Sequence, residues 1–380
     1  MGKHGVSILG ATGSIGTQTL DVLRNFPRMR VRALTGHSNI KQLSESANEF
    51  KPETVCVPDA EARIRLRALL DYDCEIVTGD EGLLYCAAES GAATVVNALT
   101  GRVGLEPTFA AIQPGVTLAL ANKESLVTAG PLVTEAVKKA GAKLTLIDSE
   151  HSAIMQCIEG GARKNIEKII LTASGGAFRD WPRERIEKAA AAAALRHPTW
   201  NMGKKITLDS ATMMNKGLEF IEAVYLYGVR PEQVEVLIHP QSIVHSMVQF
   251  ADGSVMAQLS TADMRIPIQY ALLGNTREPN DFPRLDFTGI GSLTFEKPDA
   301  RRFPCLRIAR EAVSRGGTYP AVMNMLNELA VQAYLEGELG FYDLSALIEK
   351  AFDSYTDRGL NSPGDIREAE DWAQEFFRKG

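Results

Sequence analysis

The chain has 380 residues, with 41 Lys and Arg against 47 Asp and Glu, a net charge of −6, and 45% hydrophobic residues. This length allows two or three globular domains, and the acidic balance argues against a nucleic-acid-binding surface, which needs a basic excess. The five cysteines form no C-x-x-C pair and no apolar run approaches the ~20 residues of a membrane span, so we expect a cytoplasmic protein without a disulfide scaffold, zinc ribbon or membrane partner.

Residues 1–150 alternate short apolar runs with helix-like stretches. The runs are rich in Val, Ile and Leu, as in strands covered on both faces. They are Val6–Leu9, Val31–Leu34, Thr54–Val57, Glu75–Val77, Thr94–Leu99, Val116–Ala121 and Leu144–Ile147. The helical stretches include Thr17–Asn25, Glu61–Asp71, Glu106–Ile112 and Leu132–Ala140. This alternation predicts an α/β domain with a Rossmann-like, doubly wound parallel sheet. A strand that begins at Val6 leaves no room for a signal peptide.

Residues 151–273 predict a second, α+β domain, to which a family resemblance given below assigns catalytic and dimerisation roles. Strands are expected at Ile166–Thr172 and Val234–Ile238, and a hairpin from Val244–Phe250 and Ser254–Leu259. The segment Glu187–Leu195 contains a run of alanines and is expected to be a helix.

Prolines at several positions in 274–304 predict an extended linker. Residues 305–380 predict a C-terminal all-helical domain. Its expected helices are Cys305–Ser314, Tyr319–Glu336, Asp343–Ser354 and Pro363–Arg378.

A glycine-rich turn follows the first strand and opens the first helix. Gly10–Gly16 reads GATGSIG, with G-x-x-G-x-x-G spacing. Glycines let the backbone approach a pyrophosphate, and the helix N-terminus offers free N–H groups. The position favours a nucleotide site over a merely structural turn.

The second strand ends in Thr35-Gly36-His37-Ser38-Asn39, without the carboxylate that usually holds the ribose of NAD. Polar donors there, with Arg32 or Lys41 for charge, favour NADPH. The alternative is an ordinary polar loop.

Acidic and basic residues follow two later strands. Asp148-Ser149-Glu150 comes after Leu144–Ile147, at the edge where doubly wound folds bind ligands. The carboxylates could bind Mg²⁺ or Mn²⁺, but a helix cap is an equally good explanation. Lys123, after Val116–Ala121, is either a proton-transfer group or a surface lysine.

Two further segments carry polar donors. The segment 172–176 ends a strand with small residues, and a long loop over 175–204, containing Trp200, is expected to be a lid. In DSATMMNKGLE (Asp209–Glu219), the donors Ser210, Asn215 and Lys216 suit phosphate. Helical spacing places Asn215, Lys216 and Glu219 on one face, which is also what a solvated amphipathic helix would show.

Together these motifs resemble the 1-deoxy-D-xylulose 5-phosphate reductoisomerase family over residues 5–330. The matching strings are GATGSIG (10–16), ANKES (121–125), DSEH (148–151), HPTWNMG (197–203), DSATMMNKGLE (209–219) and VLIHPQSIVHSMV (236–248). The resemblance implies a homodimer that uses NADPH and Mg²⁺, Mn²⁺ or Co²⁺. It implies isomerisation and reduction of 1-deoxy-D-xylulose 5-phosphate to 2-C-methyl-D-erythritol 4-phosphate, in the non-mevalonate isoprenoid pathway.

The resemblance also implies residue roles. The metal ligands would be Asp148, Glu150 and Glu219, which with Lys123 form the catalytic set. Substrate contacts would come from Lys123, Ser149, Glu150, Ser174, His197, Trp200, Ser210, Asn215, Lys216 and Glu219. NADPH contacts would come from Thr12, Gly13, Ser14, Ile15, Gly36, Ser38, Asn39, Asn122, Glu124 and Gly203. Two departures are Ala177, where many relatives have Pro, and His37, where some relatives have Gly.

Two rival functions share the first domain. An NADP-dependent dehydrogenase of another small phosphorylated or semialdehyde substrate would not need a three-carboxylate metal site. A non-catalytic NADPH sensor would bind the cofactor and turn nothing over.

Overall fold

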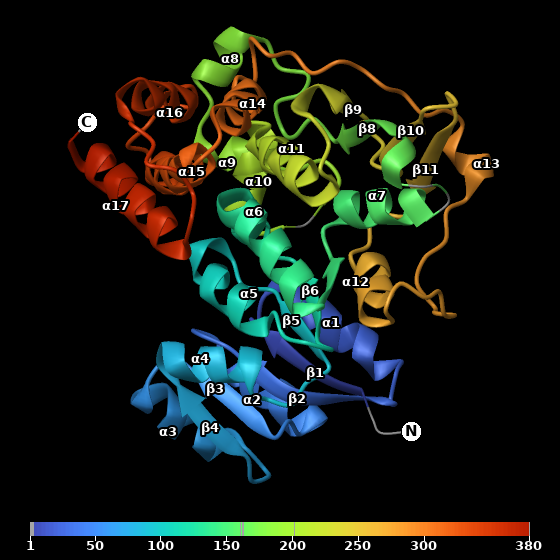
Figure 1. Cartoon of the computed structure of the whole chain (residues 1–380), viewed down its shortest axis with the longest axis vertical. Coiled ribbons are helices and arrows are strands. Elements are labelled where there is room, and N and C mark those ends of the chain that lie inside the picture. Colours follow the sequence, from blue (N-terminus) through green and yellow to red (C-terminus); the bar gives the residue numbers. More distant parts are fainter. Residues whose placement is uncertain (1–3, 160, 162, 201, 380) are drawn as a thin grey trace. The chain divides into compact units, whose positions relative to one another are not determined.

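The computed structural model describes residues 4–159, 161, 163–200 and 202–379. It divides into two compact units (Figure 1). The first holds the chain up to Ser125 with Val133–Ser152 and Asp263–Phe282, and the second holds Leu126–Leu132, Ala153–Ala262 and the chain from Pro283 on. Asp263–Phe282, which the sequence assigned to the second domain and the linker, thus packs with the first unit.

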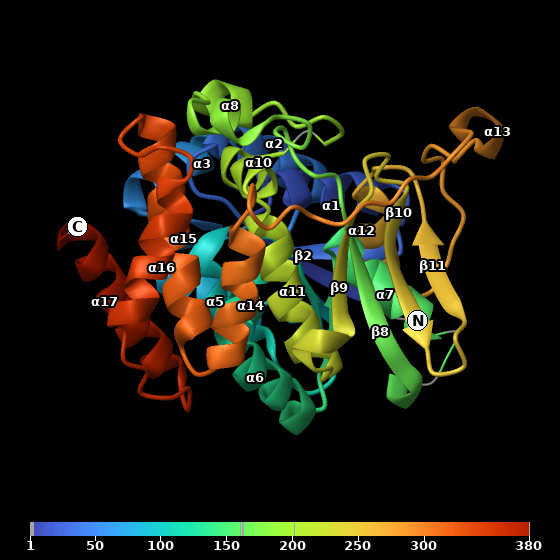
Figure 2. The ribbon, with the colours of Figure 1, turned by 90° about the horizontal axis from the view of Figure 1, so that it is seen from above.

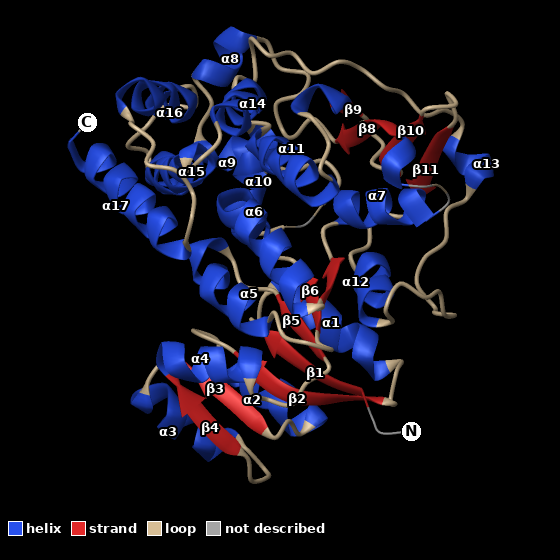
Figure 3. Ribbon diagram, in the orientation of Figure 1, coloured by secondary structure: helices blue, strands red, loops and turns tan. Residues whose placement is uncertain are grey.

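The first unit contains a seven-stranded sheet in the order β4-β3-β2-β1-β5-β6-β7 (Figure 3). Its strands are His4–Leu9 (β1), Met29–Thr35 (β2), Thr54–Val57 (β3), Glu75–Thr78 (β4), Thr94–Asn97 (β5), Thr117–Leu120 (β6) and Lys143–Leu146 (β7). Every pair in it is parallel, so the prediction of a doubly wound parallel sheet is confirmed. The strand order reverses between β1 and β5, which is where such sheets bind ligands.

Helices flank this sheet, and several begin at a side-chain cap. They are Ser14–Arg24 (α1), Ile40–Phe50 (α2), Ala60–Leu69 (α3), Gly79–Ala88 (α4), Leu105–Ala111 (α5), Lys123–Ala140 (α6) and Arg265–Leu272 (α12). Asn39, Asp59 and Asn122 accept hydrogen bonds from the first turns of α2, α3 and α6. Pro131 lies within α6, and Ala129 has non-helical angles there, so the predicted helix Leu132–Ala140 is only the second part of α6.

The core of the first unit explains why Asp263–Phe282 returns to it. Val6, Ile8 and Val96 of the sheet belong to one buried cluster with Ile268 and Phe282. Burying such side chains stabilises the fold by roughly 1.5–3 kcal/mol each, which outweighs the extended preference that the prolines impose.

The second unit is built on a mixed sheet in the order β11-β10-β8-β9 (Figure 2). Its strands are Ile166–Ala173 (β8), Val234–Ile238 (β9), Val244–Phe250 (β10) and Val255–Leu259 (β11). The hairpin between β10 and β11 is confirmed, and Gly253 supplies the positive φ (83°) of its turn.

Helices complete the second unit. They are Ser149–Glu159 (α7), Arg183–Glu187 (α8), Ala191–Ala194 (α9), Lys204–Ala211 (α10), Met214–Tyr227 (α11), Phe287–Ile290 (α13), Cys305–Arg315 (α14), Tyr319–Glu336 (α15), Asp343–Ser354 (α16) and Pro363–Lys379 (α17). The first four residues of α7 belong to the first unit. The predicted helical C-terminal region is confirmed as α14–α17. Among the residues that the structure describes, no helix has the length and apolarity to cross a membrane.

The alanine run is a correction to the sequence prediction. The expected helix over Glu187–Leu195 is broken, because Ala190 is extended (φ −74°, ψ 152°) and separates α8 from α9. The Tyr334 hydroxyl donates to the carbonyl oxygen of Ala189 at 2.9 Å. This tertiary hydrogen bond holds the backbone at the break, so the packing of α15 overrides the helix propensity of alanine.

Candidate active site

The glycine-rich turn has the geometry that its spacing predicts. Gly10 has a φ of 83°, and its N–H donates to Thr35 Oγ1 at 2.8 Å. A Cβ added at Gly16 would lie 2.2 Å from the Gly10 carbonyl oxygen, so only glycine fits there. Thr35, which the sequence placed in the polar stretch after the second strand, thereby supports the turn from the end of β2.

The turn leaves its outer face open to a ligand. Gly13 and Ser14 are exposed at the start of α1, whose first turn contains no acidic residue. The N–H groups of this turn lack intrahelical partners and carry the positive end of the helix dipole. A pyrophosphate fits this cradle at the switch point of the sheet.

The loop after β2 exposes His37, Ser38 and Asn39. Asn39 also caps α2, since its Oδ1 accepts from the Gln42 N–H at 3.1 Å. Arg32 does not reach this loop: it forms an ion pair with Glu53, which precedes β3 at the opposite end of the strands. The expectation that Arg32 would supply charge near the cofactor is therefore wrong, and Lys41 in the first turn of α2 is left as the nearby cation.

Asn122 and Glu124 are both buried, at 1% and 5% exposure. The Asn122 amide nitrogen donates to the carbonyl oxygens of Leu99 and Gly101 at 3.0 and 2.9 Å, and its oxygen accepts from the Ser125 N–H. These bonds tie the loop after β5 to the start of α6. Asn122 therefore shapes this edge of the sheet whether or not it also contacts a cofactor.

Asp148 serves as a helix cap and as an ion-pair partner. Its Oδ1 accepts from the backbone N–H groups of Glu150 and His151 at 3.2 and 3.4 Å, which caps α7. Its Oδ2 lies 3.0 Å from Lys123 Nζ, and Lys123 is only 8% exposed. Lys123 is therefore no surface lysine, and the cap at Asp148 leaves Oδ2 facing other groups.

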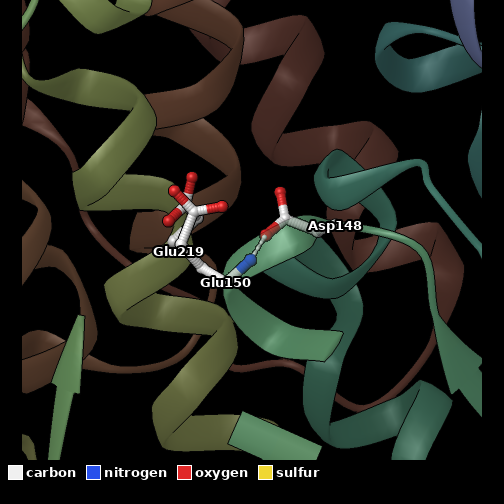
Figure 4. A group of neighbouring side chains, drawn as sticks. All are labelled: Asp148, Glu150 and Glu219. Carbon is white, nitrogen blue, oxygen red and sulfur yellow. Dashed lines mark hydrogen bonds between the residues drawn. The ribbon is translucent and has the colours of Figure 1, made fainter. Parts of the chain in front are cut away.

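Three carboxylates converge, as Figure 4 shows. Asp148, Glu150 and Glu219 each offer an oxygen, and these atoms lie within 4.8 Å of one another. Glu219 is fully buried on α11 and accepts from Asn215 Nδ2 at 2.6 Å and from the Lys216 ammonium. The prediction that Asn215, Lys216 and Glu219 share one face of a helix is confirmed. An all-oxygen, carboxylate-rich set of this kind suits a hard divalent cation.

A second group of donors gathers around Ser174 at the end of β8. The Ser174 hydroxyl lies 2.9 Å from His197 Nε2. The N–H groups of Thr199 and Trp200 both donate to His197 Nδ1. Burial lowers the pKa of His197 to about 4. The ring is therefore neutral near pH 7, and these bonds assign its proton to Nε2, which donates to Ser174.

Ser210 lies next to this group because of a close backbone contact. A Cβ added at Gly176 would lie 2.4 Å from the Ser210 carbonyl oxygen. Beyond Ser210, Met213 adopts the left-handed conformation (φ 64°) and turns the chain from α10 into α11. Such a conformation costs a non-glycine residue roughly 1–3 kcal/mol. This turn places Asn215 and Lys216 at the start of α11.

The predicted lid, 175–204, is not uniform, and Asn201 within it lies outside the described residues. Its first part is pinned: Phe178 is fully buried against Phe341, and Arg302 donates to the carbonyl oxygens of Arg179 and Trp181. Trp200 is half-buried, with its ring centroid 6.2 Å from that of His245. Gly203 is the N-cap of α10 and is exposed. We therefore expect any lid motion to lie in the later part of the segment, which contains Trp200.

Comparison with known proteins gives a consistent result over nearly the whole chain. Three family descriptions match: 1-deoxy-D-xylulose 5-phosphate reductoisomerase at residues 6–130, its C-terminal domain at 144–227, and the DXP reductoisomerase C-terminal domain at 259–376. Relatives named 1-deoxy-D-xylulose 5-phosphate reductoisomerase include those of Gloeobacter violaceus, 47% identical over 99% of this chain and 97% of the relative, and Symbiobacterium thermophilum, 48% identical over 99% and 98%.

Solved structures agree with the sequence relatives. The reductoisomerase from Zymomonas mobilis in complex with NADPH is 42% identical, with a TM-score of 0.92, over 98% of this chain and 97% of that one. A DOX-P reductoisomerase in complex with NADPH, fosmidomycin and magnesium is 40% identical, with a TM-score of 0.91, over 99% and 98%.

Proposed function

Because the chain belongs to the 1-deoxy-D-xylulose 5-phosphate reductoisomerase family, we propose a role in that reaction for each group of residues above. The protein is an NADPH- and divalent-metal-dependent oxidoreductase of the non-mevalonate isoprenoid pathway. It isomerises 1-deoxy-D-xylulose 5-phosphate and reduces the product to 2-C-methyl-D-erythritol 4-phosphate. The two rival functions are not favoured.

The convergence of three carboxylates is the observation that supports this function, because it marks where the substrate reacts. Asp148, Glu150 and Glu219, whose carboxylate oxygens lie within 4.8 Å of one another, would hold the metal ion. When bound, the ion polarises the carbonyl of the substrate and acidifies a neighbouring hydroxyl. Lys123, held beside Asp148, donates hydrogen bonds to a substrate oxygen and can take part in moving its proton. Ser149, whose hydroxyl bonds to the Glu150 carboxylate, faces the same oxygens.

The remaining groups of residues bind NADPH and the phosphate of the substrate. The glycine turn holds the pyrophosphate of NADPH through Thr12, Gly13, Ser14 and Ile15. The loop after β2 faces the 2′-phosphate with Gly36, Ser38 and Asn39. The remaining cofactor contacts come from Asn122, Glu124 and Gly203. Ser174, His197, Ser210, Asn215 and Lys216 surround the phosphate of the substrate. The neutral His197 donates to Ser174, which leaves the Ser174 hydroxyl proton available to the phosphate.

One assay tests this function. NADPH absorbance should fall when 1-deoxy-D-xylulose 5-phosphate and Mn²⁺ are both present, and a chelator should stop the reaction. Turnover that resists the chelator would indicate the rival dehydrogenase, and cofactor binding without turnover would indicate the sensor.

Cofactor preference provides a direct prediction. With no acid in the loop after β2, NADPH should be favoured over NADH by at least ~1.4 kcal/mol, about tenfold in kcat/KM. Ser38→Glu should erode this ratio, because a carboxylate repels the 2′-phosphate and accepts from a ribose hydroxyl. Ser38→Gln, which matches glutamate in size, is the uncharged control. Equal kcat/KM with both cofactors in the wild-type protein would contradict the assignment.

Trp200 should report closure of the later part of the lid. We expect its fluorescence to change when a phosphonate hydroxamate mimic of the substrate binds, because the ring moves to cover the ligand. The measurement uses a variant with Trp181→Phe and Trp372→Phe, because these two tryptophans, which contact Phe178 and Phe376, would otherwise contribute to the fluorescence. The same background with Trp200→Phe is the blank. A signal that ignores saturating ligand would refute a closing Trp200.

We propose further that the protein is a homodimer that works in the cytoplasm. The edge strand β11 leaves Val255 and Met256 about half exposed, and Phe287 of α13 is 65% exposed. Unpaired strand edges with apolar side chains associate readily, and a second copy would cover them. The five cysteines are free thiols, which suits a reducing compartment.

A further inference from the structure

Asp209 is a buried carboxylate directly before Ser210, on α10. It is 1% exposed, and its Oδ1 accepts from Asn327 Nδ2 of α15 at 2.8 Å. Its Oδ2 lies 3.0 Å from Lys205 Nζ, one helical turn earlier. Asn327 is itself fully buried. A buried charge persists only when it is paired and hydrogen-bonded, and Asp209 meets both conditions.

The surroundings of Asp209 are buried, since Asn327 and Cys305 are both at most 2% exposed. Burial, and then the charge of Asp209, raise the pKa of the Cys305 thiol to about 12. In such surroundings a hydrogen bond to a charged group is stronger than it would be at the surface. The bond from Asn327 therefore holds α10 on α15 at this point.

The C-terminal end of α10 also contacts the Gly176 turn. Ser210 has its carbonyl oxygen so close to Gly176 that no Cβ could be inserted there. A shift of α10 along α15 would change this close contact with the turn that carries Ser174. Two contacts therefore bear on the position of Ser210: the bond of Asp209 to Asn327 on α15, and the approach of its carbonyl oxygen to Gly176 on the loop after β8.

The charge of Asp209 also needs explanation, because a carboxylate beside a phosphate would weaken phosphate binding. The ammonium of Lys205 lies against it and offsets this charge. The arrangement keeps a strong anchor for α10 without leaving a net negative charge next to Ser210.

We propose that Asp209 is a positioning residue for the phosphate of the substrate: by accepting from Asn327 it anchors α10 to α15 and fixes Ser210 where the phosphate binds. This inference rests on the proposed assignment of Ser210 to the phosphate. It gives the C-terminal helical region a part in substrate affinity through a residue that does not touch the substrate.

The test exchanges the partners. Asn327→Asp places a second carboxylate against Asp209 and should raise KM for 1-deoxy-D-xylulose 5-phosphate at least ~10-fold, the loss of one hydrogen bond to a charged group, with a smaller change in kcat. The double variant Asp209→Asn with Asn327→Asp restores a donor facing a carboxylate and should recover KM to within about threefold of wild type. If Asn327→Asp does not fold, Asn327→Leu, which removes the donor without adding charge, must raise KM in the same direction.

Controls separate positioning from general damage. Asn324→Asp makes the same change one turn away on α15, where Asn324 bonds to Glu328 and not to α10, and should leave KM unchanged. Unphosphorylated 1-deoxy-D-xylulose should be turned over equally by wild type and Asn327→Asp. A loss shared by both substrates, an equal effect of Asn324→Asp, or no recovery in the double variant would overturn the inference.

Ser210→Ala separates the assignment of Ser210 to the phosphate from the positioning role of Asp209. If it leaves KM for the phosphorylated substrate unchanged, the proposed phosphate assignment of Ser210 fails. If it raises KM while the Asn327 variants do not, the assignment stands and the positioning role of Asp209 is wrong.

Discussion

Replacing Glu219 by Gln is expected to reduce metal-dependent turnover by ~100-fold or more, with the fold retained. The amide has nearly the shape of the carboxylate, so packing on α11 should survive, but it removes one charge from the three-carboxylate group. Changes in residues that only support metal ligands already cost roughly 10–100-fold in affinity or activity, and a direct ligand should cost at least as much. Mn²⁺ affinity by calorimetry and kcat at saturating Mn²⁺ measure the effect.

Glu222 offers a matched control for this experiment. It is buried on the same helix, three residues on, and lies outside the carboxylate group. Glu222→Gln should leave the Mn²⁺ affinity near the wild-type value. If Glu219→Gln has normal turnover and unchanged metal affinity, Glu219 is not a metal ligand.

Replacing Lys216 by Ala should lower kcat/KM for the phosphorylated substrate by ~10- to 150-fold, since a hydrogen bond to a charged group contributes ~1.5–3 kcal/mol. Lys216 is 4% exposed, so its ammonium is held in place before the substrate arrives. Charge-assisted bonds of this kind to a phosphate are about twice as strong as neutral ones. Steady-state kinetics with 1-deoxy-D-xylulose 5-phosphate and with the dephosphorylated sugar measure the effect.

In Lys216→Ala, kcat/KM for the dephosphorylated sugar should fall far less, because this sugar has no phosphate for Lys216 to hold. Lys216 also pairs with Glu219, so Mn²⁺ affinity is measured in the same variant to separate an effect on the metal from an effect on the phosphate. Lys168→Ala removes a surface lysine that pairs with Glu235, and is the control for loss of a lysine as such. An equal loss on both substrates, or none on either, would show that Lys216 does not bind the phosphate.

Much of both units could be predicted from the sequence because the signals are local. The strand Thr54–Val57 and the helix Tyr319–Glu336 have the predicted bounds, since composition and flanking residues define both. The glycine turn is equally local: Gly10 needs a positive φ and Gly16 has no room for a Cβ. The shared face of Asn215, Lys216 and Glu219 follows from helical spacing alone.

Contacts between distant segments decided the rest. Asp148 could be a cap or a ligand by sequence, and the structure shows that one oxygen caps α7 while the other faces Lys123. The alanine run breaks where Tyr334 bonds to Ala189. The role proposed for Asp209 follows only from its hydrogen bond with Asn327, 118 residues away. Local sequence thus determined the elements and the chemistry at their ends. Only the tertiary structure decided which buried polar groups meet, because their partners come from parts of the chain that no short-range pattern connects.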